Sequence, residues 1–181
     1  MEPDGPGSRD VPIDRARPQD ARAIAAVHVE VWRNAYSGLL PDHTLKGLSV
    51  GQLAPHYETA IRFGSGVLVA RAAQGRVVGF ATASPCAAGA PAEGEVHTLY
   101  VLDDWRERGI GRSLLQEAAR QLAHRSCRSL FLWVLADNPS RWFYERLGGR
   151  PALRGSTRVG GRLLPQLAMV WDPIERLAGR E

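Results

Sequence analysis

Hydrophobic residues follow a helical spacing in the first third of the chain and mainly a strand spacing after it. Residues 11–17 alternate as a strand does, and residues 18–20 are typical of a helix start. A first helix ending near residues 37–38 is predicted by one apolar face, made of Ile24, Val27, His28, Val31 and Trp32. A short helical segment over 39–42 and a third helix over 51–63 follow. The first third of the chain is therefore predicted to be mostly helical.

From residue 66 onward the pattern predicts a sheet. Residues 67–70 and 76–83 are predicted as antiparallel strands joined by a turn at Gln74-Gly75, and residues 85–94 as a loop. Residues 95–101 form the next predicted strand, followed by a helix with the apolar stripe Leu114, Leu115, Ala118, Ala119 and Leu122.

An almost continuously apolar segment over 129–135 completes a βαβ unit, in which the two strands run parallel. A short helix over 138–147, closed by Gly148-Gly149, and a final strand over 163–171 come after it. The predicted class is a single α/β domain with a mixed sheet.

Composition is consistent with this class. With 181 residues and 44% hydrophobic content, the chain suits one globular domain, predicted over 11–172 between a flexible segment over 1–10 and a C-terminal tail over 173–181. No apolar run approaches the ~20 residues of a membrane-spanning helix, and residues 1–10 are polar, unlike a signal peptide. We expect a cytoplasmic protein without a membrane partner.

Charge and cysteine content exclude two further classes. The net charge of +4 comes almost wholly from arginines scattered from Arg9 to Arg180, so no clustered basic patch indicates nucleic acid. Cys86 and Cys127 lie far apart, without C-x-x-C or His-rich spacing. We therefore expect no disulfide and no metal.

The most informative segment is residues 99–116, LYVLDDWRERGIGRSLLQ, where a strand passes through a glycine turn into a helix. The first N–H groups of a helix have no intrahelical partner and carry partial positive charge, so they bind phosphate well. Gly109 and Gly111 allow close backbone approach, and Arg106, Arg108 and Arg112 add guanidinium groups. A plain strand-to-helix connection without a ligand is the alternative.

The pattern Arg106-x-x-Gly109-x-Gly111, preceded by Tyr100-Val101 and followed by Arg112-Ser113-Leu114-Leu115, resembles the acetyl-CoA pyrophosphate loop of GNAT-type N-acetyltransferases. The resemblance covers roughly residues 11–172 and is strongest over 93–149. It implies the GNAT fold, a mixed sheet splayed open between its fourth and fifth strands with helices on both faces. Asp103 replaces a proline that is common in the family, which we expect to loosen the turn.

The resemblance also implies site residues. Acetyl-CoA is expected to contact Leu99, Tyr100, Val101, Arg106, Arg108, Gly109, Ile110, Gly111, Arg112, Ser113, Asn138 and Tyr144. The backbone N–H of Leu99 is expected to face the thioester oxygen. Tyr144 resembles the family's tyrosine that protonates the departing CoA sulfur; the alternative is a tyrosine that only packs a helix on the sheet.

Glu95 is the favoured general base, and strand alternation predicts one shared face for Glu93, Glu95, His97 and Leu99. An acceptor pocket is expected to involve His28, Trp32, Tyr36 and His97, with core packing as the alternative role of Trp32.

Two functions follow from these patterns. The first is an N-acetyltransferase that moves an acetyl group from acetyl-CoA to a primary amine of a small molecule, peptide or protein by direct attack in a ternary complex. The second is a non-catalytic acyl-CoA-binding sensor or partner module. The presence of Tyr144 together with the pyrophosphate loop favours the enzyme. A homodimer is left open.

Overall fold

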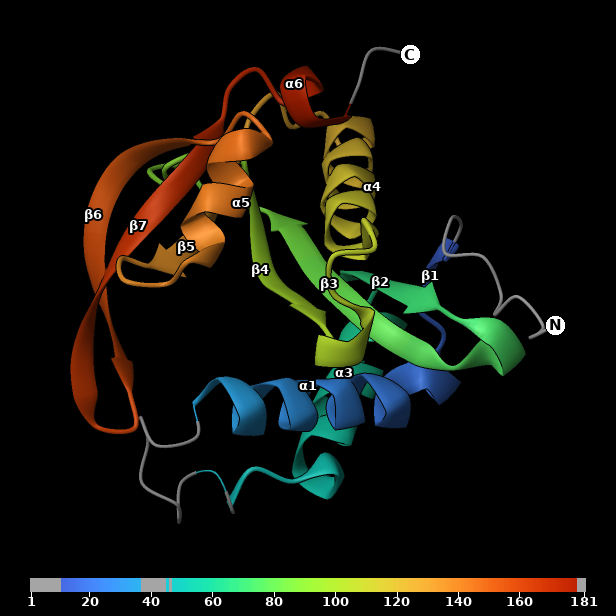
Figure 1. The fold of residues 1–181 in the computed structure, drawn as a ribbon. Coiled ribbons are helices and arrows are strands. Elements are labelled where there is room, and N and C mark those ends of the chain that lie inside the picture. The colour runs from blue at the N-terminus through green and yellow to red at the C-terminus, as the bar shows by residue number, and fades with distance from the viewer. Residues whose placement is uncertain (1–10, 37–44, 46, 179–181) are drawn as a thin grey trace, which may run out of the picture.

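The structure, a computed structural model, describes residues 11–36, 45 and 47–178 (Figure 1). The helical segment predicted over 39–42 lies outside these residues. The sheet has seven strands in the order β1-β2-β3-β4-β5-β7-β6. The strands are β1 (Ile13–Arg15), β2 (Gly66–Arg71), β3 (Val77–Pro85), β4 (Gly94–Val101), β5 (Leu130–Leu135), β6 (Arg150–Val159) and β7 (Arg162–Trp171). The α-helices are α1 (Ala21–Ala35), α3 (Val50–Arg62), α4 (Ile110–His124), α5 (Ser140–Arg146) and α6 (Glu175–Ala178).

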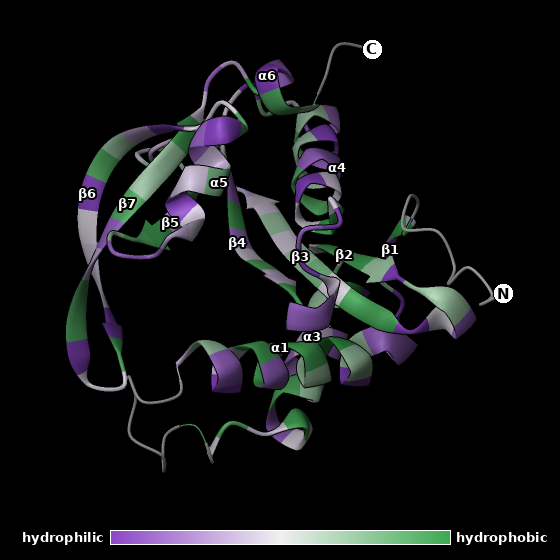
Figure 2. Ribbon diagram, viewed as in Figure 1, coloured by the Kyte–Doolittle hydropathy of each residue, from purple (hydrophilic) through white to green (hydrophobic). Residues whose placement is uncertain are grey.

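Helices cover both faces of the sheet, as predicted. Helices α1 and α3 lie below β2, β3 and β4 in Figure 1, whereas α4 packs on the opposite face of these strands and α5 packs on β5 and β7. The apolar sides of α1 and α4 turn toward the sheet (Figure 2). Leu114, Leu115, Ala118, Ala119 and Leu122 are all buried, so the stripe predicted for this helix is its core face.

The sheet opens between β4 and β5. These parallel strands pair only at Gly94 with Leu130 and at Glu95 with Phe131. On the other side of β4, pairing with β3 continues up to Val101. Beyond Glu95, the edge of β4 that faces β5 has no strand partner in the described part of the chain, and the two strands diverge (Figure 1). The predicted splay is confirmed, and it leaves backbone N–H and C=O groups of β4 unpaired.

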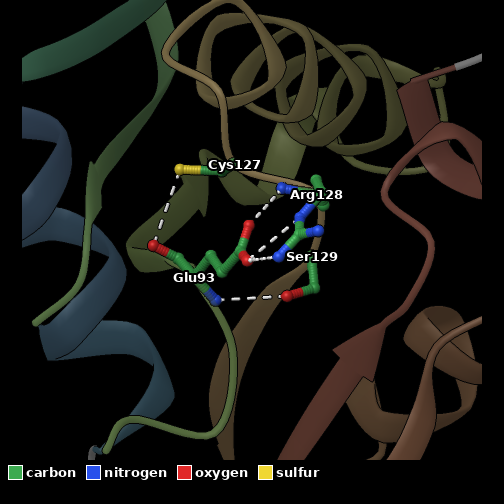
Figure 3. A network of polar contacts seen from close by, with 4 residues as sticks. All are labelled: Glu93, Cys127, Arg128 and Ser129. Carbon is green, nitrogen blue, oxygen red and sulfur yellow. Dashed lines mark hydrogen bonds and ion pairs between the residues drawn. The ribbon is translucent and has the colours of Figure 1, made fainter. Parts of the chain in front are cut away.

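The closed end of this splay is held by Glu93, immediately before β4 (Figure 3). Its carboxylate accepts hydrogen bonds from the backbone N–H of Arg128 at 2.6 Å and from the Arg128 guanidinium at 2.8 and 3.2 Å. Its own N–H donates to Ser129 Oγ at 3.2 Å, and its carbonyl accepts from Cys127 Sγ at 3.5 Å. One residue thus connects the start of β4 to the three residues that precede β5.

The sequence prediction was wrong in three places. Strand β6 was not predicted, because its residues are mostly exposed and arginine-rich and only β7 pairs with it. Strand β1 spans three residues rather than 11–17. The segment after residue 172, expected as a tail, forms α6 and buries Ile174 and Leu177 against the core. The errors at β1 and α6 concern elements whose pairing or packing partners, β2 and α4, are distant in sequence, whereas the error at β6 follows from its exposed, polar composition.

Candidate active site

The turn before α4 has the geometry of an anion site. Glu107 and Gly109 adopt left-handed backbone conformations, with φ of 61° and 81°, and Gly109 is the N-cap residue of α4. No side chain caps the helix, and the first intrahelical bond runs from Ser113 N–H to Gly109 C=O at 2.9 Å. The N–H groups of residues 110–112 therefore have no intrahelical partner, and binding of an oxyanion there stays a prediction.

The arginines of the turn are all exposed, but they differ in their contacts. The Arg106 guanidinium pairs with Asp103 at 2.9 Å, and the Arg108 guanidinium lies over the Trp105 ring, 4.9 Å from its centroid. Asp103 also accepts a hydrogen bond from Asn34 Nδ2 of α1 at 3.0 Å. The two oxygens of Asp103 therefore connect the turn to Arg106 and to α1, and the expectation that Asp103 loosens the turn stays a prediction.

Tyr144 lies on α5, beside the open part of the splay. Its ring packs edge-on against Trp171, with centroids 6.2 Å apart, and Trp171 Nε1 donates to the Leu147 carbonyl at 2.9 Å. A Cβ on Gly149 would come within 2.6 Å of the Trp171 ring, so glycine is needed for this close approach. The end of α5 is thereby locked to β7, and the Tyr144 ring is fixed with it.

The Tyr144 phenol is suited to hold a proton. Burial, with a smaller contribution from the charge of the nearby Tyr100, raises the pKa of Tyr144 to about 12. The hydroxyl makes no hydrogen bond to any described residue and so has its proton available. A thiolate whose conjugate acid has a pKa near ~8.5 accepts that proton only uphill, which requires direct contact with sulfur.

Asn138, expected to contact the cofactor, has a local role. Its Oδ1 accepts a hydrogen bond from the Ser140 N–H at 2.8 Å, which satisfies one of the free donors at the start of α5. Its carboxamide oxygen is therefore engaged within the protein. Contact between Asn138 and acetyl-CoA stays a prediction.

A β-bulge in β4 alters the predicted arrangement of the site. Thr82 pairs with Thr98 and Ala83 with Val96, so His97 is an extra residue in β4. Side chains before and after a bulge change their phase, so Glu95, His97, Thr98 and Tyr100 share the face covered by α1 and α3. Leu99 and Val101 point to the α4 face. The expectation that Leu99 shares a face with Glu95 and His97 is wrong, and Glu93 lies outside the strand in its contact with Arg128.

The α1 face of β4 carries a polar row. Ser84 Oγ lies 2.7 Å from His97 Nε2, and His97 Nδ1 lies 3.5 Å from Glu95 Oε1. Two members of the row, Glu95 and His97, were predicted as site residues, but Ser84 was not. The only sequence signal for Ser84 is its place on the strand that pairs with β4, and that pairing depends on the bulge.

An aromatic cluster lies on the same side of the sheet, between α1, α3 and the strands. His28 Nδ1 lies 2.7 Å from Tyr57 Oη, and Trp32 Nε1 donates to Tyr100 Oη at 3.0 Å. The Tyr36 ring stacks near Trp32, with centroids 4.8 Å apart. Burial, and secondarily His56, lowers the pKa of His28 to about 4, so its imidazole is neutral at pH 7. The structure therefore brings His28, Trp32 and Tyr36 together as predicted, and adds Tyr57 of α3.

Among the described residues, no three His, Cys, Asp or Glu side chains are grouped so that they could hold a metal ion. None of the helices in this part of the chain has the length and apolar character that a membrane crossing requires.

The unpaired edge of β4 leads to the uncapped start of α4, and comparisons with known proteins identify the class of protein that has this arrangement. Residues 32–149 match the acetyltransferase (GNAT) family. The chain therefore belongs to the GNAT acetyltransferase family, and it is an enzyme of the acyltransferase class.

The similarity to individual relatives extends over most of the chain. It is 29% identical over 168 residues to YuaI, an uncharacterized N-acetyltransferase of Bacillus subtilis (strain 168), with 92% of this chain and 96% of that protein covered. The crystal structure of ribosomal-protein-alanine N-acetyltransferase from Brucella melitensis is similar at 27% identity and a TM-score of 0.69, covering 88% of this chain and 98% of that one. The structure of YncA, a putative acetyltransferase from Salmonella typhimurium, with its cofactor acetyl-CoA, shares the fold at 20% identity and a TM-score of 0.69. The match covers 90% of this chain and 94% of that one.

Proposed function

We propose that the chain transfers an acetyl group from acetyl-CoA to a primary amine by direct attack of the amine on the thioester in a ternary complex. The observation that carries this proposal is the unpaired edge of β4 beyond Glu95, which leads directly to the uncapped start of α4. A pantetheine arm can pair with that edge as an added strand would, while the pyrophosphate binds at the helix start. The strand edge that binds the pantetheine arm is then continuous with the helix start that binds the pyrophosphate.

The two proton transfers of the reaction are assigned to residues on opposite sides of β4. On the α5 side, Tyr144 supplies a proton to the departing thiolate, since its raised pKa keeps it protonated at neutral pH. On the α1 side, Glu95 accepts the proton of the incoming ammonium, directly or through a water. The donor and acceptor therefore approach from opposite sides of the gap.

The acceptor is a primary amine of a small molecule, peptide or protein. Aromatic rings from α1 and β4, chiefly Trp32, Tyr36 and Tyr100, lie on the same side of the sheet as Glu95 and His97, the side that we assign to the acceptor. Aromatic faces and a carboxylate both attract an ammonium group, which supports an amine acceptor.

The test measures thiol release from acetyl-CoA across a panel of primary amines, together with calorimetry of acetyl-CoA binding. We expect binding by the parent protein and turnover with at least one amine. Glu95→Gln is expected to lower kcat by about 10²-fold, at the lower end for general acid–base catalysis, with the affinity for acetyl-CoA unchanged.

Glu58→Gln is the matched control, because Glu58 lies on the exposed surface of α3 in a local pair with Arg62. Its kinetics are expected to equal those of the parent. Binding of acetyl-CoA without turnover on any amine would replace the proposed activity by that of an acyl-CoA-binding module.

A further inference from the structure

We propose that Ser84, His97 and Glu95 form a proton relay on the acceptor face, in which Glu95 receives the proton of the ammonium, His97 passes a proton on to solvent, and Ser84 positions the imidazole. The inference rests on the proposed acetyl transfer to an amine, and it adds a positioning residue and an exit route for the proton.

The distances on the two sides of the imidazole differ. The contact of Nε2 with Ser84 Oγ, at 2.7 Å, has the length of a strong hydrogen bond, whereas Nδ1 and Glu95 Oε1 are 3.5 Å apart. The relay uses the tautomer with its proton on Nε2, donating to Ser84 Oγ. The Nδ1 lone pair then faces a carboxylate oxygen, and two acceptors without a proton between them stay apart.

With this tautomer, a proton can pass from the ammonium group through Glu95 and His97 to solvent. The ammonium N–H bond breaks and a Glu95 O–H bond forms, which leaves a neutral amine to attack the thioester carbon. Glu95 then gives that proton to His97 Nδ1, and the imidazolium gives its Nε2 proton to water, directly or through the Ser84 hydroxyl. The neutral imidazole, now protonated on Nδ1, returns to its starting tautomer through exchange with solvent.

Exposure and position fit these roles. The side chain of Glu95 is 25% exposed and that of His97 44% exposed, so the proton moves from the more buried group toward the more exposed one. Both residues stand next to the bulge, where β4 leaves β5 and the gap begins. Cys86 also lies near Glu95, and burial, with Glu95 contributing less, raises the pKa of its thiol, which keeps it neutral.

Ser84 itself touches neither donor nor acceptor in this scheme and is a positioning residue. It lies opposite Glu95 in the β3–β4 register, so its hydroxyl reaches the imidazole from the neighbouring strand. Without this hydroxyl, the ring loses its hydrogen bond to β3 and can turn toward solvent. A Ser84→Thr substitution keeps the hydroxyl and is the conservative variant.

The experiment compares Ser84→Ala, Ser84→Thr and His97→Gln with the parent on one responsive amine, and includes Thr82→Val as control. Thr82 Oγ1 bonds to Thr98 Oγ1 at 2.7 Å across the same two strands, but this bond includes no titratable group. At pH ~7 we expect kcat to fall roughly tenfold in Ser84→Ala and at least as much in His97→Gln, with KM for acetyl-CoA unchanged; Ser84→Thr and Thr82→Val stay near the parent.

A second readout separates proton removal from a structural effect. A primary alkyl amine has a pKa near ~10.4, so at pH ~9.5 an appreciable share is already neutral in solution. The ratio of parent to Ser84→Ala activity is expected to shrink toward one at that pH, whereas a distorted site stays impaired. Melting temperatures of all variants show whether each is folded.

The outcomes are distinct. A parent that turns over while Ser84→Ala and His97→Gln stay within twofold of it overturns the relay and leaves the acetyl transfer in place. The relay is overturned as well if Thr82→Val loses as much activity as Ser84→Ala, or if the loss in Ser84→Ala persists at high pH. A parent that binds acetyl-CoA but acetylates no amine overturns both proposals.

Discussion

The two sides of β4 are built in different ways. On its α4 side, the anion site is assembled from consecutive residues, Leu102 to Ser113, which pass from a strand end through a turn into a helix. On its α1 side, the proposed acceptor face combines residues of α1, α3, β3 and β4, and their alignment depends on a one-residue bulge. A site made from one continuous segment can be found by its pattern, whereas a site made from several segments depends on their packing.

The largest effect is expected from Gly109→Val, which tests the α4 side. A β-branched residue cannot easily adopt φ of 81°, so the turn must rearrange and the helix-start N–H groups lose their common direction. Loss of two charge-assisted hydrogen bonds, worth about 1.5–3 kcal/mol each, corresponds to roughly 10²–10⁴-fold weaker acetyl-CoA binding. Calorimetry measures the affinity, and circular dichroism checks that the domain is folded.

Gly111→Ala is the matched control for this prediction. A Cβ at Gly111 would lie 3.6 Å from the Phe143 ring, an ordinary contact, and its backbone is helical. Its affinity for acetyl-CoA is therefore expected to stay within a few-fold of the parent. Equal losses in both variants would mean that general crowding, and not the turn conformation, determines binding.

Tyr144→Phe is expected to give a smaller effect and separates catalysis from binding. The ring keeps its contact with Trp171, and the lost hydroxyl had no hydrogen bond among the described residues. We therefore expect unchanged stability and acetyl-CoA affinity, with kcat lower by about 10²-fold because a strongly raised pKa makes the phenol a weak acid. Steady-state kinetics that stay within about twofold of the parent would assign Tyr144 a packing role instead.

The smallest effect concerns stability on the α1 side. His28 has its pKa lowered by burial from the ordinary 6.5 to about 4, so the unfolded chain binds more protons between these values. The contribution of neutral His28 is fully present above pH 6.5 and is lost as the pH falls toward 4. His28→Gln, which keeps a polar partner for Tyr57, is expected to flatten the fall in melting temperature over this range.

The parent and His28→Gln curves are expected to run parallel above pH ~7, where histidine is neutral in both states. The carboxyl groups of Asp20 and Glu93, whose pKa values are lowered, add their own losses only below their ordinary values of 3.8 and 4.5. Parallel curves down to pH ~5 would show that His28 does not have to stay neutral in the folded protein.

Hydrophobic periodicity located most elements correctly, including the buried stripe of α4 and the apolar strand β5. These elements are defined by local periodicity, which a sequence displays directly. Strand β6 has no apolar alternation, because only one neighbour pairs with it and most of its side chains remain in solvent. Helix α6 is recognisable only once α4 provides the surface that buries Leu177.

The glycine turn before α4 can be recognised from local sequence, because glycines at fixed spacing before an amphipathic helix favour the left-handed backbone at Gly109 and leave the N–H groups that follow it free. The local pattern also shows which strand leads to that turn. Which side chains of β4 lie on the α1 side depends on strand pairing, because an extra residue at the bulge reverses the alternation and moves Leu99 away from Glu95 and His97. Only the pairing of β3 with β4 brings Ser84 to His97, since a hydroxyl from a neighbouring strand has no fixed spacing in the sequence.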